Sequence, residues 1–143
     1  MLQRIQTVYL FLAMLSLSGL FFFPIAELSL QGLNFEKINK ALLDGKFFVA
    51  ENMILLSICI IVMLDLLSAI FLFKNRKLQI LVATAGNIGA GALTVGATYF
   101  ASESGGSSAV GLAFPAIAMI LTMLAVRNIR KDEELVRSSD RLR

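Results

Sequence analysis

The charged residues of this chain are distributed very unevenly, and this feature constrains the fold more than any other. Four apolar windows together hold one charged residue, Asp65: residues 5–26, 52–73, 78–102 and 107–126. All other charged side chains of the chain, which has 13 Lys and Arg and 10 Asp and Glu, lie outside these windows. A soluble domain needs charges on all of its surface elements, and a disordered chain lacks long apolar runs, so both classes are excluded.

Each window is long enough to cross a lipid bilayer as a helix. At about 1.5 Å per residue, a run of about 20 residues covers the roughly 30 Å of a hydrocarbon core. The runs are continuously apolar, without the alternation that a barrel strand requires. The sequence therefore predicts an all-α polytopic membrane protein, a four-transmembrane-helix bundle in which residues 1–143 form a single membrane domain. The windows are its spans, residues 27–51 form an outer loop, and residues 127–143 form a cytoplasmic C-terminal helical tail.

The orientation of the spans follows from Lys and Arg, which favour the cytoplasmic side in short connecting segments. One side of the membrane carries ten of these residues: Arg4, Lys74, Arg76, Lys77, Arg127, Arg130, Lys131, Arg137, Arg141 and Arg143. The other side carries Lys37, Lys40 and Lys46. We therefore expect both termini in the cytoplasm. The net charge of +3 then reflects membrane topology, and no nucleic-acid partner is expected.

Asp65 is the one charged residue inside the windows. It lies nine residues before Lys74, about 13 Å along a helix, where an ionised carboxylate is costly unless protein or water faces it. If the second and third windows pack antiparallel, Asp65 meets Gly86 or Asn87. We therefore predict an intramembrane polar site in which Thr84 and Asn87 donate hydrogen bonds to Asp65. This site is either a clamp that fixes the register of the helices or a proton or ion relay.

The third window contains many small residues, which let helices approach closely in a membrane. At 100° per residue, two faces of this helix are small. The first face consists of Ala85, Gly89, Ala92 and Gly96, and the second of Thr84, Asn87, Gly91, Thr94 and Thr98. We expect this helix to contact neighbours on both sides.

Residues 35–43 have apolar side chains at positions 35, 38 and 42, a spacing that predicts a short amphipathic helix. This helix is expected to lie on the outer interface and to cap the bundle.

The sequence offers few residues for enzyme chemistry, because the chain has no His and a single cysteine, Cys59. We therefore expect a non-enzymatic protein with no catalytic residue, no metal site and no cofactor.

The tail from Arg127 is expected to be helical, because Glu133 precedes Arg137 by four residues, the favourable order for a helical ion pair. Such a helix either continues the fourth span or lies on the bilayer surface, where its bases attract anionic lipid headgroups. Docking of the tail to a partner protein is the alternative.

The terminal motifs MLQRIQTVYL and RKDEELVRSSDRLR resemble those of a family of small four-span bacterial inner-membrane proteins classed as a domain of unknown function. The resemblance implies the four-helix topology and the bacterial inner membrane, and it implies no activity. Both motifs fall on the predicted cytoplasmic face, where we expect a single interaction surface. Its residues are Gln3, Arg4, Arg130, Lys131, Asp132, Glu133, Arg137 and Arg141.

Two functions of different classes remain open. The first is an accessory or assembly subunit of a larger inner-membrane complex, which binds other membrane protein subunits or further copies of itself. The alternative is a small proton- or ion-coupled transporter that works through Asp65 as an oligomer. A single intramembrane charge and the lack of an internal repeat weigh against transport.

Overall fold

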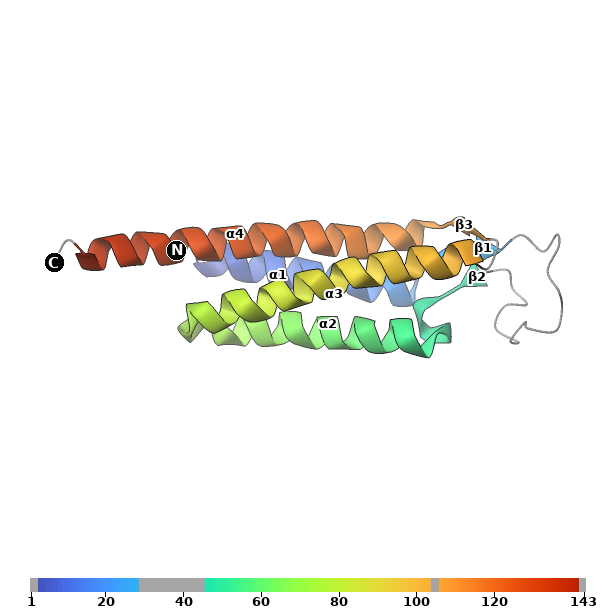
Figure 1. Ribbon diagram of the computed structural model, residues 1–143, viewed down its shortest axis with the longest axis horizontal. Helices are drawn as coiled ribbons and strands as arrows, with labels where there is room; N and C mark the ends of the chain where they lie inside the picture. The colour runs from blue at the N-terminus through green and yellow to red at the C-terminus, as the bar shows by residue number, and fades with distance from the viewer. Residues whose placement is uncertain (1–2, 29–45, 104–105, 142–143) are drawn as a thin grey trace.

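The computed structural model describes residues 3–28, 46–103 and 106–141, and this part of the chain contains four long α-helices (Figure 1). They are α1 (Gln3–Ser18), α2 (Met53–Phe71), α3 (Arg76–Glu103) and α4 (Ala113–Arg141). Each helix packs against two others, in the ring order α1, α2, α3, α4 and back to α1. The predicted helix over residues 35–43 lies outside the described residues.

The helices run roughly along one long axis, which gives the molecule two distinct ends (Figure 1). We call the end where α1 begins and α4 finishes the terminal end. At the opposite end, which we call the sheet end, lie three very short strands: β1 (Ala26–Leu28), β2 (Lys46–Phe47) and β3 (Gly106–Ser108). At the sheet end, α3 lies close to α4, and towards the terminal end it diverges from α4 and follows α2 (Figure 1).

The small sheet, which the sequence analysis did not predict, joins the two connections at the sheet end. Strand β1 is central and pairs antiparallel with both others, with Ala26 opposite Phe47 on one side and Ser108 on the other. Backbone hydrogen bonds extend this pairing, from Ile25 N to Phe47 O at 2.7 Å and from Ala109 N to Ile25 O at 3.0 Å. The sheet therefore ties the α1–α2 connection to the α3–α4 connection.

Local sequence explains where the helices begin. The side chain of Asn52 caps α2, accepting hydrogen bonds from Ile54 N at 2.9 Å and Leu55 N at 3.2 Å. Asn75 precedes α3, and its side chain accepts from Leu78 N at 3.3 Å. Pro115 lies in the first turn of α4, where a residue without an N–H is tolerated because that N–H would have no helical partner. These residues set the ends of the helices without interrupting them.

Short 3-10 turns flank the helices: η1 (Gly19–Phe21), η4 (Val49–Glu51), η5 (Leu72–Lys74) and η6 (Val110–Leu112).

Three helical segments of the described chain are long and apolar enough to cross a membrane: Met53–Lys74, Arg76–Ser102 and Val110–Val136. The segment Ile5–Phe21 is also apolar but shorter. Helix α4 runs without a break from the apolar part into the charged C-terminal part and extends beyond the other helices at the terminal end (Figure 1).

The exterior of the bundle is unusually apolar. Large apolar side chains on the outside of the helices include Phe22, Met53, Phe71, Leu81 and Val95, and their exposed fractions range from 66% to 85%. In water such a surface would drive aggregation, whereas in a bilayer it contacts lipid tails at no cost. The interior contains fully buried side chains of α1, α2 and α3, such as Leu17, Leu55 and Leu93.

Glycines of α3 allow close approach to α2. A Cβ on Gly86 would lie 3.1 Å from Leu66 Cδ2, and a Cβ on Gly96 would lie 3.2 Å from Leu55 Cδ2. The predicted small face of α3 is therefore only partly correct. Gly89 and Gly96 do face α2, but Ala85 and Ala92 are exposed, because the contact is centred nearer to Gly86.

Candidate functional site

Asp65 lies in α2 opposite the glycine that the antiparallel register predicted. A Cβ on Gly86 would lie 3.6 Å from Asp65 Cβ. Asp65 is half-buried, and the Ser68 hydroxyl donates to its backbone carbonyl at 2.9 Å, not to its carboxylate. Within the described ranges, no group donates a hydrogen bond to the carboxylate and no side-chain oxygen is buried without a partner. The carboxylate oxygens of Asp65 are therefore accessible at the surface of the bundle.

The structure does not join Thr84 and Asn87 to Asp65 as the sequence analysis predicted. Asn87 Nδ2 donates to the Met119 carbonyl of α4 at 2.7 Å, and the Thr84 hydroxyl donates to the Ile80 carbonyl of its own helix at 2.7 Å. The reason is angular, because Asn87 follows Gly86 by one residue and so lies 100° further around α3. The side chain of Asn87 consequently faces α4, while Gly86 faces α2 and Asp65.

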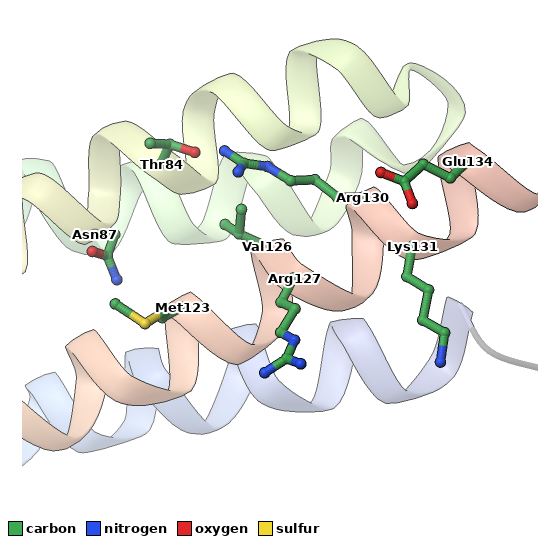
Figure 2. A pocket seen from close by; sticks show the side chains of 8 residues that line it. All are labelled: Thr84, Asn87, Met123, Val126, Arg127, Arg130, Lys131 and Glu134. Carbon is green, nitrogen blue, oxygen red and sulfur yellow. The ribbon is translucent and has the colours of Figure 1, made fainter.

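Thr84 and Asn87 instead line a groove between α3 and α4, which we call the terminal groove. It has a volume of about 480 Å³ and opens where α3 diverges from α4 (Figures 1 and 2). Its lining residues are Thr84, Asn87, Met123, Val126, Arg127, Arg130, Lys131 and Glu134. Two residues predicted for the cytoplasmic surface, Arg130 and Lys131, thus lie in the same groove as two residues predicted for the intramembrane site.

Polar side chains near the terminal end connect all four helices. Gln6 of α1 is 5% exposed and Asp132 of α4 is 9% exposed, and Gln6 Nε2 donates to Asp132 Oδ2. Arg76 of α3 donates from Nη1 to the Asp132 backbone carbonyl at 3.0 Å. Gln79, 3% exposed, donates to the Ala69 carbonyl of α2 at 3.0 Å. These polar side chains therefore form hydrogen bonds that join neighbouring helices.

The other predicted surface residues are only partly brought together. Asp132 is buried and not available to a partner, because Gln6 covers it. Glu133 is half-buried, and Arg130 and Lys131 are exposed. Gln3, Arg4, Arg137 and Arg141 lie on the described helices, but their side chains are outside the described part of the structure.

Sequence reasoning missed the contacts between helices that Gln6, Arg76 and Gln79 make. The sequence did contain a signal for the two glutamines, because Gln6 and Gln79 are isolated amide side chains at the edges of long apolar runs. A metal site is not formed by the described residues, because no three His, Cys, Asp or Glu side chains there are grouped closely enough.

The apolar exterior, the long apolar helices and the segregation of charge define an α-helical membrane protein. Within this class, the chain belongs to the family described as Domain of unknown function (DUF4293), whose family model matches residues 2–142. Neither a curated protein nor a solved structure matches the chain.

Proposed function

We propose that the protein is a four-span protein of the bacterial inner membrane with its terminal end in the cytoplasm. The first span is α1 with η1, which together reach about 30 Å from their helical rises. This segment packs beside α4 and exposes apolar side chains such as Phe11 and Leu15. The cytoplasmic orientation of the terminal end rests on the excess of Lys and Arg there.

Thiol labelling in intact cells tests this orientation. Single cysteines are placed at Ser107 and at Ser138 in a Cys59→Ser background. A membrane-impermeant maleimide is expected to label the Ser107 position in intact cells and the Ser138 position only after lysis. Labelling of the Ser138 position before lysis would reverse the orientation.

We further propose that the protein is a non-enzymatic accessory or assembly subunit that contacts another membrane protein, or another copy of itself, through the face of α2 that carries Asp65. The observation that supports this most is the accessible Asp65 carboxylate, which accepts no hydrogen bond from the part of the chain that the structure describes. A carboxylate in the apolar part of a membrane helix is unfavourable unless protein or water faces it. A donor from a neighbouring subunit removes this cost, and the flanking side chain of Ile61, 57% exposed, adds apolar contact area.

The projecting end of α4 supports the same proposal. Because α4 continues straight beyond the other helices, its last turns extend away from the bilayer when the bundle spans it (Figure 1). Leu135 and Val136 are 53% and 48% exposed in this part of α4, where lipid tails do not cover them. A partner protein at the cytoplasmic face would bury such side chains.

Photo-crosslinking in native membranes tests the subunit proposal. A photoreactive amino acid is placed at Ile61, next to Asp65 on the helix, and in a matched control at Ile60, which lies about 140° away from Asp65 and is also exposed. A discrete adduct is expected from position 61 and not from position 60. Asp65→Leu should abolish the adduct and Asp65→Asn should retain it, since an amide still forms hydrogen bonds.

The same variants separate this proposal from the transporter alternative. If Asp65 forms a subunit contact, Asp65→Leu abolishes the adduct whether or not a proton gradient is present. If Asp65→Asn left the adduct unchanged and abolished proton or ion flux in proteoliposomes, the relay function would replace the subunit function. Equal adducts from positions 60 and 61 would indicate random collision in the membrane and would contradict the proposed face.

A further inference from the structure

The terminal groove has a chemical gradient along its length. Its inner part, toward the sheet end, is formed by Thr84 and Asn87 of α3 and by Met123 of α4. Its mouth, toward the terminal end, is formed by the cations of α4. The hydrogen bond from Asn87 to the Met119 carbonyl shows that the inner part lies beside the apolar portion of α4. The groove therefore runs from the apolar part of the bundle to its charged end.

The mouth of the groove is strongly cationic. Arg127, Arg130 and Lys131 lie within about one helical turn, and Glu134 is the one acidic side chain among the described residues of the lining, which together carry a net charge of +2. All three cations are exposed, and none forms an ion pair with a carboxylate of the described residues. In Figure 2, Arg130 extends from α4 toward the part of α3 that carries Thr84, across the groove. Two guanidinium groups are well suited to bind phosphate oxygens in pairs.

The inner wall offers hydrogen-bond acceptors as well as apolar contact. The Thr84 hydroxyl already donates to Ile80, so toward the groove it can accept. Asn87 uses an N–H on Met119, which leaves its Oδ1 as an acceptor. Met123, which is 59% exposed, provides an apolar surface beside them. The second N–H of Asn87 can donate to an ester carbonyl, so a ligand that fits this groove has an apolar chain beside Met123, an ester group near Asn87 and an anionic group at the mouth.

We propose that the terminal groove binds the headgroup of an anionic phospholipid, with the phosphate at Arg127 and Arg130 and an acyl chain descending past Met123. The ligand class with this sequence of groups is a glycerol phosphate diester attached to fatty-acyl chains, such as phosphatidylglycerol. Basic pockets between membrane helices at the cytoplasmic surface are suited to such headgroups. The proposal is independent of any partner at Asp65, because Asp65 lies on α2 and the groove lies between α3 and α4.

Lipid titration of the full-length protein tests this site. The delipidated protein in mild detergent is titrated with phosphatidylglycerol or with phosphatidylcholine of the same acyl chains, and bound lipid is counted by native mass spectrometry. Phosphatidylglycerol is expected to bind more tightly than phosphatidylcholine. The double variant Arg127→Gln/Arg130→Gln should weaken phosphatidylglycerol binding by about 30-fold, the loss of two cations near the headgroup layer.

Lys74→Gln/Lys77→Gln is the matched control, because it removes two exposed cations from the same end of the bundle that do not line the groove. It should weaken binding by less than about threefold. Equal losses in both double variants would show a general attraction of the basic end for anionic lipid and would overturn the site. If the first double variant does not fold, Arg130→Lys serves instead, with the expectation of a smaller but measurable loss because the bidentate fork is lost.

A soluble phosphate ester distinguishes a lipid from a free ligand. Glycerophosphoglycerol carries the same phosphate diester without acyl chains, so it should not displace bound phosphatidylglycerol at equal concentration. Displacement at equal concentration would show that the acyl chain contributes nothing, and the groove would then be a site for a soluble phosphate ester. That result would overturn the assignment to a lipid.

Discussion

Replacing Gln6 with Leu is expected to destabilise the terminal end of the bundle more than any exposed substitution there. Gln6 Nε2 is the donor to the Asp132 carboxylate, and both residues are at least nine-tenths buried. A hydrogen bond to a charged group contributes about 1.5–3 kcal/mol, and removing the donor leaves a buried carboxylate without its partner. We therefore expect Gln6→Leu to lower the free energy of unfolding by about 2–3 kcal/mol.

A double-mutant cycle isolates the pair from other effects of the substitution. Asp132→Leu alone also breaks the pair, but Gln6→Leu/Asp132→Leu removes both polar groups together and should recover about 1–2 kcal/mol relative to the sum of the single variants. The hydrogen bond from Arg76 is to the backbone carbonyl of residue 132 and is retained in all variants. The coupling energy therefore reports the bond between the two side chains.

The assay is unfolding by sodium dodecyl sulfate in mixed micelles, followed by far-ultraviolet circular dichroism and extrapolated to zero denaturant. Glu134→Gln is the control, since this exposed side chain has no described hydrogen bond, and it should change the free energy of unfolding by less than about 0.5 kcal/mol. If Gln6→Leu behaved like this control, or if the cycle gave no coupling, the hydrogen bond between Gln6 and Asp132 would not stabilise the helix packing as argued.

Two glycine substitutions test close contacts elsewhere. Gly111→Ala should lower the free energy of unfolding by about 1–3 kcal/mol, because the added Cβ would overlap the Pro24 carbonyl, which is backbone and cannot turn away. Gly91→Ala is the control and should have little effect in the same assay, because the nearest atom to its Cβ is the sulfur of the flexible Met119 side chain at 3.6 Å. Gly89→Ala should weaken α2–α3 packing by a similar amount, because its Cβ would overlap Val62, and adding Val62→Ala should restore part of the loss; no restoration would place the strain elsewhere.

The helices were predictable because their signal is local. Long apolar runs determine where α2, α3 and the first part of α4 lie, and the antiparallel arrangement about a tight turn places Asp65 near Gly86 without further information. The first helix is shorter than its window of residues 5–26. It gives way to a 3-10 turn at Gly19, and Pro24 and Ile25 then direct the chain into the sheet.

The parts that were not predictable depend on contacts between distant segments. Each strand has only two or three residues, too few to show an alternating pattern, and β1 gains its partners from segments about 20 and 80 residues away. The burial of Asp132 has a similar cause. A charged helical tail indicates solvent exposure, and only the position of Gln6 on a neighbouring helix makes the buried carboxylate acceptable. The direction of Asn87 was wrong by one helical step, which a register estimate does not resolve.

The pairing of the first strand with the last has a consequence for the order of synthesis. Because β1 pairs with β3 and α1 packs extensively against α4, the first helix finds its main partners only when the final helix has left the ribosome. Until α4 is made Gln6 has no Asp132, and until β3 is made β1 has one unpaired edge. A nascent chain that stops before β3 therefore exposes both unpaired groups at once, and membrane quality control can recognise it as incomplete.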